Sequence, residues 1–216
     1  MPYTAHMSRR AADPPPAVPR PAVNQSDPRV KRTRQLLQAA LVELMAEKKF
    51  DAISVQDIAE RATVNRTTFY DHFADKHELF ACFSRAWFRQ ALQQRVPADA
   101  TFSRANLELL ILASMQALAE MDDHCAPAEA LKPLVMSAVQ EELSALLLGW
   151  LERVPERAPR QLGSLETTAA GLSWAIFGTA LNWSRMPERS PAEPTASRIA
   201  DLLTEGLSSV VGELTS

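Results

Sequence analysis

Residues 64–80, with the sequence VNRTTFYDHFADKHELF, carry side chains that can bind a nucleic acid. Hydroxyl and guanidinium groups hydrogen-bond the edges of bases, a threonine methyl group can contact a thymine methyl group, and tyrosine, histidine and lysine can bind phosphates. Side chains of these kinds are concentrated in one short span, at Arg66, Thr67, Thr68, Tyr70, His72 and Lys76. Their types and spacing favour DNA as the ligand of this stretch.

Three helix starts follow one another closely around these side chains. Ser54 and Asp57 form a capping-box pattern, Asn65 can cap a second helix, and Asp75 with Glu78 repeats the box. The pattern predicts two short helices with only two residues between them, followed by a long helix. That order is the outline of a helix-turn-helix.

Two phenylalanines are expected to fix the second short helix, about 65–72, on the protein. Phe69 and Phe73 share one helix face and can pack against the first short helix, about 54–62. The polar side chains then face the solvent. The alternative is a short, well-capped surface helix without a ligand, because helix-turn-helix outlines are degenerate.

A longer helix is predicted upstream. Asp27 and Pro28 form a good helix start, and the helix should run to about Lys48. Lys31 and Arg32 lie in its first turns, where positive charge opposes the helix dipole. A nearby phosphate would reverse that penalty.

The stretch SVQDIAERATVNRTTFYDHFADKHELF resembles the DNA-binding signature of the TetR family of transcriptional repressors. It contains the Ile-Ala pair, the Tyr-x-His-Phe sequence and the following Lys-x-x-Leu, and the resemblance extends over residues 29–83. It departs from the family pattern at Thr63, where glycine is common in the turn. Threonine tolerates a positive φ poorly, so a local adjustment of the turn is expected.

The resemblance implies a role for each matched polar residue. The second helix would reach a base edge or a phosphate, the third would make base contacts from its first residues and phosphate contacts from its later ones, and the fourth would face the DNA backbone from its start. With two of the cations of the first helix and the capping asparagine, the candidate DNA-binding residues are Lys31, Arg32, Gln56, Asn65, Arg66, Thr67, Thr68, Tyr70, His72 and Lys76.

The whole chain is predicted to be all-α, because alanine, leucine, glutamate and arginine are abundant and only 6 of 216 residues are glycine. A proline-rich tail at 1–26 is expected to be disordered, either a passive appendage or a basic arm on DNA. A helix-turn-helix DNA-binding domain at 27–75 and a connecting helix at 76–96 follow. Residues 97–216 should form about five helices, which the resemblance assigns to effector binding and dimerisation.

Two glycines suggest a helix contact in the second half. Gly171 and Gly178 lie on one face of a predicted helix, although each weakens it by about 1 kcal/mol relative to alanine. Close approach of another helix would explain them, either from the same chain or from a second subunit. With the apolar face of the last helix, the candidate dimer interface is Gly171, Gly178, Ile199, Leu203 and Leu207.

A ligand pocket is expected among the aromatic and sulfur-bearing side chains of the middle helices, where apolar walls suit a hydrophobic small molecule. The alternative for each of these side chains is an ordinary core position. The candidates, including two polar ones, are Phe102, Met115, Met121, His124, Trp150, Trp174, Phe177, Asn182 and Trp183.

Charge and composition limit the setting. The formal net charge of -3 divides into +4 over residues 1–90 and -7 over residues 91–216, which suggests that only the first part meets a polyanion. Cys82 and Cys125 are too few for a disulfide framework and are expected to be free buried thiols. Without a secretory signal or an apolar run of membrane-spanning length, a cytoplasmic protein is expected.

An enzyme is the main alternative from another class. The sequence MDDHC at residues 121–125 could hold a metal ion, but no second ligand pair stands at a characteristic spacing. HExxH, GxSxG and phosphate-loop motifs are absent from the sequence. We therefore expect no catalytic residues, no metal and no cofactor.

The resemblance implies a homodimer that binds a pseudo-palindromic operator in double-stranded DNA. It also implies a small hydrophobic effector whose binding releases the operator, which makes the protein a repressor. A DNA-binding protein that senses no ligand, with a second half that only dimerises, is the remaining alternative.

Overall fold

The structure is a computed structural model that describes residues 27–125, 128–154 and 164–211, with the side chains of 124, 125 and 207–211 left out. The predicted tail at 1–26 lies outside the described residues. Within these limits the chain is all-α, as predicted, and contains no strand. Its elements are α1 (Pro28–Glu47), a 3-10 turn (Phe50–Ala52), α2 (Val55–Arg61), α3 (Arg66–His72), α4 (Lys76–Gln93), α5 (Arg104–Cys125), a second 3-10 turn (Glu129–Leu131), α6 (Lys132–Leu151), α7 (Leu165–Ser184) and α8 (Ala192–Val211).

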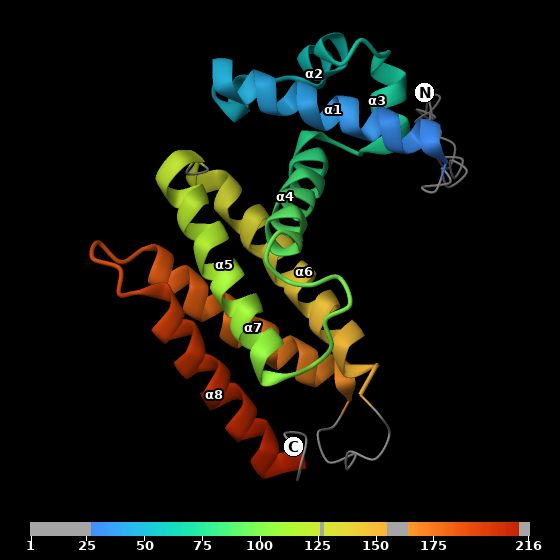
Figure 1. Cartoon of the computed structure of the whole chain (residues 1–216). Helices are drawn as coiled ribbons and strands as arrows, with labels where there is room; N and C mark the ends of the chain where they lie inside the picture. The colour runs from blue at the N-terminus through green and yellow to red at the C-terminus, as the bar shows by residue number, and fades with distance from the viewer. Residues whose placement is uncertain (1–26, 126–127, 155–163, 212–216) are drawn as a thin grey trace, which may run out of the picture.

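The helices form two groups that α4 joins. Helices α1, α2 and α3 lie together at the N-terminal end, and α4 runs from them into a bundle of α5, α6, α7 and α8 (Figure 1). The bundle thus contains four α-helices in the described residues, rather than the predicted five. A 3-10 turn precedes α6 directly.

The predicted helix starts of the N-terminal group are confirmed. Asp27 accepts a hydrogen bond from the Arg29 amide at 2.8 Å, and Ser54 forms a complete capping box with Asp57. Asn65 and Asp75 cap α3 and α4 with their side-chain oxygens, but the second predicted box is not complete, because Glu78 accepts from the Ala74 amide instead of the Asp75 amide. These caps satisfy amides that have no partner inside the helix, which fixes where each helix begins.

The turn between α2 and α3 contains the one positive φ at a non-glycine residue in the described chain. Thr63 has φ 57°. Its amide bonds to the Glu60 carbonyl at 3.0 Å, and the Val64 amide bonds to the Ala59 carbonyl at 2.9 Å. This is a Schellman motif, which normally ends in glycine. The expected adjustment of the turn is therefore absent, and threonine itself adopts the left-handed conformation.

Thr63→Gly should stabilise the protein by about 0.5–1 kcal/mol. The left-handed conformation costs a non-glycine residue about 1–2 kcal/mol, and glycine removes this cost. Glycine also raises the conformational entropy of the unfolded chain, which offsets part of the stabilisation. Urea unfolding of the purified variant measures the change. Thr63→Ala keeps a Cβ and should gain little, so equal effects of the two substitutions would contradict the explanation by φ.

Helix α5 packs against α7 and α8. Leu107, Leu110 and Ile111 are fully buried on one face of it, as their spacing predicts. At its start, Arg104 bonds to Asp201 of α8 at 2.6 Å and to the Ser197 hydroxyl at 2.8 Å. Segments almost a hundred residues apart in sequence are thus joined.

Helix α6 lies between α4 and α7. By length and composition alone, the span Glu129–Leu151 could cross a membrane, contrary to the expectation that no apolar run would be long enough. However, the helix packs on α4 and α7, and its acidic residues Glu141 and Glu142 bond to Arg85 and Arg89 of α4. These are the contacts of a central bundle helix, which is apolar because it is covered on several sides.

Candidate functional site

Helix α3 is held by its aromatic side chains, as predicted. Phe69 is fully buried, Phe73 is 2% exposed, and their ring centroids lie 5.9 Å apart. Phe73 itself is extended and ends the helix rather than continuing it. Because this side of α3 is buried, Arg66 and Thr67 are exposed on the outside.

Arg66 is already positioned on the surface of α3. Its guanidinium donates to the Tyr70 hydroxyl at 3.2 Å and lies 5.6 Å from the centre of the Tyr70 ring. Stacking on a ring one turn away limits the rotamers of a long side chain while leaving its other N–H groups available. An exposed, oriented guanidinium of this kind can read a guanine edge.

The other predicted DNA-contact residues near Arg66 differ in their exposure and hydrogen bonds. Gln56 of α2 is exposed and donates to Glu60 at 2.6 Å, whereas Thr68 and Tyr70 are half-buried. Asn65 uses its side-chain oxygen as the cap of α3, so only its amide nitrogen remains for a ligand.

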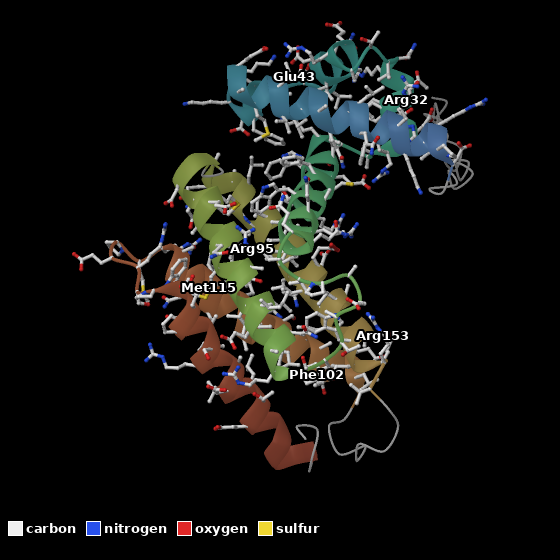
Figure 2. The ribbon with its side chains drawn as sticks, in the orientation of Figure 1. Arg32, Glu43, Arg95, Phe102, Met115 and Arg153 are labelled. Atoms are coloured by element: carbon white, nitrogen blue, oxygen red, sulfur yellow. The ribbon has the colours of Figure 1, made fainter. Side chains whose placement is uncertain are left out.

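The two predicted phosphate ligands of α1 lie together near its start. Lys31 and Arg32 are both exposed, and Figure 2 shows Arg32 near the N-terminal end of α1. They enter no ion pair with a residue that the structure describes. Both are therefore available to a phosphate, and their contact with DNA stays a prediction.

The comparisons with known proteins agree with this geometry. Residues 36–82 match the family model of bacterial regulatory proteins of the tetR family. An uncharacterised HTH-type transcriptional regulator, YxbF of Bacillus subtilis (strain 168), is 46% identical over 56 residues, 26% of this chain and 15% of that protein. An uncharacterised HTH-type transcriptional regulator of Haemophilus influenzae is 43% identical over 49 residues, 23% of this chain and 24% of that protein. The matches thus span less than a quarter of either relative.

Solved structures extend the similarity of fold to both groups of helices. A TetR-family regulator of Streptomyces coelicolor has a TM-score of 0.54 at 19% identity, covering 83% of this chain and 97% of that one. The flavonoid-responsive regulator FrrA has a TM-score of 0.52 at 18% identity, covering 83% and 96%. Residues 36–82 thus match the DNA-binding domain of the TetR family, and both groups of helices share the fold of the TetR-family regulator from Streptomyces coelicolor.

The structure shows the surroundings of two predicted phosphate contacts, the first of which is His72. Its Nδ1 atom is buried and has no hydrogen-bond partner among the described residues. Burial and, after it, the charge of Arg34 lower the pKa of His72, so the ring is neutral at pH 7. We place the proton of the neutral ring on Nε2, because a proton on the buried Nδ1 would be a hydrogen-bond donor without an acceptor. His72 can therefore offer a hydrogen bond to a phosphate but not a positive charge.

The second predicted contact, Lys76, needs correction. Its ammonium bonds to the carbonyl oxygens of Phe50 at 2.9 Å, Asp51 at 3.2 Å and Ile53 at 2.8 Å. All three N–H groups are thus used inside the protein. Lys76 closes the 3-10 turn of residues 50–52 onto the start of α4, instead of facing the DNA backbone with its charge.

Lys76→Met should lower the free energy of unfolding by about 2 kcal/mol, because it leaves three carbonyl groups without their charged donor. Urea unfolding measures this loss, with the exposed Lys49→Met as the matched control. The slope of DNA affinity against salt concentration should stay unchanged. A slope reduced by about one would instead show that Lys76 neutralises a phosphate.

Contacts that the sequence did not suggest brace the TetR-family domain. Arg61 of α2 bonds with two nitrogens to Glu47 of α1, at 2.9 and 2.8 Å. Asp57 accepts from Lys48 at 2.8 Å and from Ser54. Hydrogen bonds from Lys48 and then Ser54 lower the pKa of Asp57 to about 2, so this carboxylate is ionised at neutral pH. Helices α1 and α2 therefore present α3 as one unit.

Arg34 has a similar bridging role. Its guanidinium donates to the His72 carbonyl at 3.0 Å and to the Cys82 sulfur at 3.2 Å, and lies 4.2 Å from the centre of the Phe73 ring. It joins α1 to the end of α3 and to α4. Cys82 is a free thiol, as predicted, but is only half-buried, while Cys125 lies outside the described side chains.

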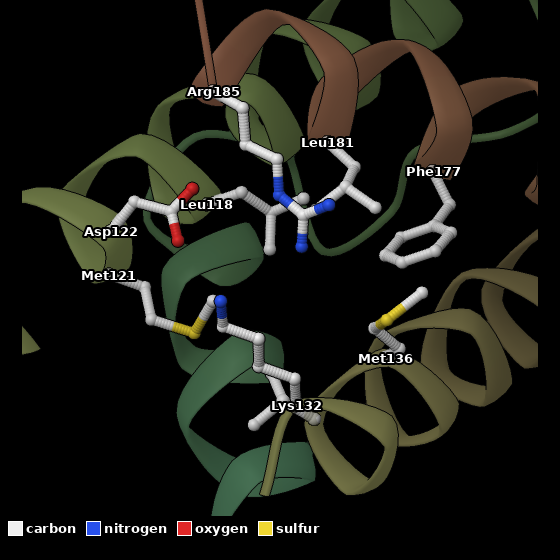
Figure 3. Close-up of a pocket in the computed structure, with 9 residues that line it drawn as sticks. Leu118, Met121, Asp122, Lys132, Met136, Phe177, Leu181 and Arg185 are labelled. Carbon is white, nitrogen blue, oxygen red and sulfur yellow. The ribbon is translucent and has the colours of Figure 1, made fainter. Parts of the chain in front are cut away.

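A crevice opens between α5, α6 and α7 in the helical bundle. It occupies about 300 Å³ including its mouth (Figure 3). Only Met121 and Phe177 of the predicted pocket residues line it. The residues that sequence reasoning missed are Leu118, Asp122, Lys132, Val135, Met136, Leu181 and Arg185.

The other predicted pocket residues lie elsewhere. Met115 and Trp150 are buried core residues, and the Trp183 indole donates to the Ser190 carbonyl. Phe102 lies at the N-terminal end of α5, at the opposite end of this helix from the crevice (Figure 2). Trp174 is 57% exposed. Asn182 is also exposed, and the side chain of His124 is outside the described residues. Aromatic type alone did not distinguish pocket from core or surface.

The glycines of α7 are not covered within the chain. A Cβ on Gly171 or Gly178 would meet nothing within 4 Å, which rules out close packing against a described helix. Both are exposed on the same face as Trp174, while Ile199 and Leu203 of α8 are half-buried. The side chain of Leu207 lies outside the described residues.

Proposed function

We propose that the protein is a homodimeric transcriptional repressor that holds a pseudo-palindromic DNA operator and releases it when a small hydrophobic ligand binds. The observation that carries the proposal is the exposed, oriented Arg66 on a helix fixed by the buried Phe69. The match of residues 36–82 to the tetR family model supports DNA binding and transcription regulation and gives no support to catalysis. Because operators are cytoplasmic in bacteria, a cytoplasmic location follows from the proposal.

The outward face of α7 and α8 supports a dimer. Trp174 is 57% exposed and Leu202 is 64% exposed, although both are apolar and large. Beside Trp174, Gly171 and Gly178 leave room for a close approach from outside the chain. A second copy would bury these surfaces. Two copies of α3 would then read two successive major grooves, which calls for an inverted repeat.

The domain division is part of the proposal. Residues 27–75 would bind DNA, residues 76–96 would connect, and residues 97–216 would bind the effector and dimerise. The ligand site would be the crevice, which lies where α5 ends and α6 begins, at the end of the bundle that faces α1 in Figure 1.

Ion pairs link the walls of the crevice to α4, and thus to the DNA-binding helices. Glu120, within the α5 segment that lines the crevice, bonds to Arg95 just after α4 at 3.2 Å. Glu142, further along α6, bonds to Arg89 of α4 with two oxygens. A ligand that separates α5 from α6 would therefore move α4 and change the spacing of the two α3 helices. The ligand weakens DNA binding only to the extent that its own affinity is higher for the changed arrangement than for the DNA-bound one.

The Arg89–Glu142 pair should show a coupling energy of about 1 kcal/mol in a double-mutant cycle. Glu142 is only 12% exposed and the pair makes two hydrogen bonds, whereas fully exposed pairs contribute little. Urea unfolding of the two alanine variants and of the double variant measures the coupling. The Lys132–Glu129 pair, with Glu129 87% exposed, is the control and should give nearly zero. Equal coupling energies for the two pairs would contradict the inference that the Arg89–Glu142 pair links α4 to α6.

Selection from a randomised pool of double-stranded DNA at moderate salt tests the proposed function. Recovery of an inverted repeat supports a dimeric, sequence-specific regulator. Salt-sensitive binding without sequence preference would contradict it. With the operator known, unchanged DNA affinity in the presence of a ligand shown to bind would instead support a regulator that senses no effector.

A further inference from the structure

We propose that the crevice between α5, α6 and α7 takes an apolar monocarboxylate, and that Arg185 and Lys132 bind its carboxylate group. The proposal rests on the proposed ligand-responsive function and adds the chemical class of the ligand. It predicts that negative charge on the ligand, as well as apolar area, determines affinity.

The inner wall of the crevice is apolar. Leu118 of α5, Val135 and Met136 of α6, and Phe177 and Leu181 of α7 line it. These side chains nearly close the space, since a cavity of only about 10 Å³ remains, room for about one water molecule. An occupant must therefore move side chains apart, and it gains affinity by burying apolar area against this wall.

Two methionine side chains lower the free-energy cost of such an opening. Met121 and Met136 lie on opposite sides of the crevice in Figure 3, on α5 and α6. Methionine is unbranched and changes rotamer at low cost, so it adapts to occupants of different shape. A compact aliphatic or aromatic body fits this wall better than a rigid polar one.

The polar end of the crevice offers positive charge. Arg185 is exposed, and Figure 3 shows its guanidinium directed into the crevice from the end of α7. It forms no ion pair with any part of the chain that the structure describes. Lys132 is paired only with Glu129, three residues earlier and 87% exposed, and such a pair is readily exchanged for a ligand carboxylate.

The acidic groups at the same place are already engaged. Asp122 lines the crevice and accepts a hydrogen bond at 2.8 Å from Ser184, whose side chain is buried. The neighbouring Asp123 is neutralised by Arg189, with two hydrogen bonds of 2.7 Å. The lining itself therefore holds two cations against one carboxylate, which favours an anion over a cation.

A second hollow fixes where the charged end would lie. A polar groove lined by Asp123, Ser184, Arg185, Met186, Pro187 and Arg189 borders the crevice on the α7–α8 side. Arg185 lines both hollows. A molecule that places its apolar body in the crevice has its polar end beside this guanidinium, which can bind a carboxylate with two hydrogen bonds.

Isothermal titration of the full chain with octanoate, octan-1-ol and octylammonium tests the proposal. The three probes share one apolar chain and differ in charge. We expect octanoate to bind most tightly, and Arg185→Gln to weaken octanoate about tenfold while leaving octan-1-ol unchanged. Lys132→Gln should weaken octanoate by a smaller factor. Arg153→Gln is the matched control, since Arg153 is exposed at the other end of α6 (Figure 2).

Equal binding of octanoate and octan-1-ol, or an Arg185→Gln variant with unchanged octanoate affinity, would overturn the proposal. Preferred binding of octylammonium would assign the polar end to Asp122 instead, and absence of binding by all three would also reject the ligand class. DNA selection is independent of these titrations. An inverted repeat with no octanoate binding rejects only the ligand class, whereas failure of the selection rejects the proposed function.

Discussion

Arg66→Ala is expected to weaken binding to the selected operator by about 1–3 kcal/mol, which is a loss of roughly five- to 150-fold. The exposed guanidinium is held against Tyr70, so its orientation is already determined before DNA arrives. A bidentate contact with a guanine would lose both hydrogen bonds on truncation. Fluorescence anisotropy with the operator and with variants substituted at each position measures both the loss and the position at which discrimination disappears.

Arg32→Ala is the matched control, because Arg32 is also an exposed arginine but lies on α1. It should weaken all DNA sequences alike and reduce the salt slope by about one, as a phosphate contact does. The same uniform pattern for Arg66→Ala would mean that Arg66 also contacts a phosphate, and that another residue reads the sequence.

Phe69→Ala is expected to destabilise the DNA-binding domain by about 3–5 kcal/mol, because it empties a fully buried position that also packs on Phe73. Helix α3 has only seven residues and cannot persist without tertiary contacts. Operator binding should therefore be lost together with helical structure, even though no DNA-contacting group is changed. Circular dichroism during urea unfolding, with operator binding in parallel, checks both effects.

Leu36→Ala provides the comparison for this substitution. Leu36 is 44% exposed on α1, and its truncation should change stability by less than about 0.5 kcal/mol. If Phe69→Ala lowered the free energy of unfolding no more than Leu36→Ala, the inference that aromatic side chains hold α3 on the protein would be wrong.

The elements of the DNA-binding half were predictable because their signals are local. Asp27, Ser54, Asn65 and Asp75 each cap the helix that directly follows, and such hydrogen bonds span two or three residues. The strained turn at Thr63 was also visible as a departure from glycine. Its outcome was not, since only the structure shows that threonine adopts φ 57°.

Groups that act between distant segments escaped prediction. Lys76 looked like a phosphate ligand, but its partners are carbonyls 23 to 26 residues earlier in the chain. Arg34 meets Cys82 across 48 residues, and Arg185 reaches the crevice only because α5, α6 and α7 converge there. No spacing in the sequence encodes such meetings. Long flexible cations are the residues whose partners depend most on tertiary structure.

The joining of α5 to α8 by Arg104 and Asp201 bears on the order of events during synthesis. The contacts among α1 to α4 link segments within about 50 residues, so this half can form soon after it leaves the ribosome, whereas the pair Arg104–Asp201 closes a loop of 97 residues. Until α8 emerges, α5 has no partner on one side. A nascent chain would thus display a finished DNA-binding surface before it can be regulated, and truncated chains lacking α8 would expose apolar surface to chaperones and proteases.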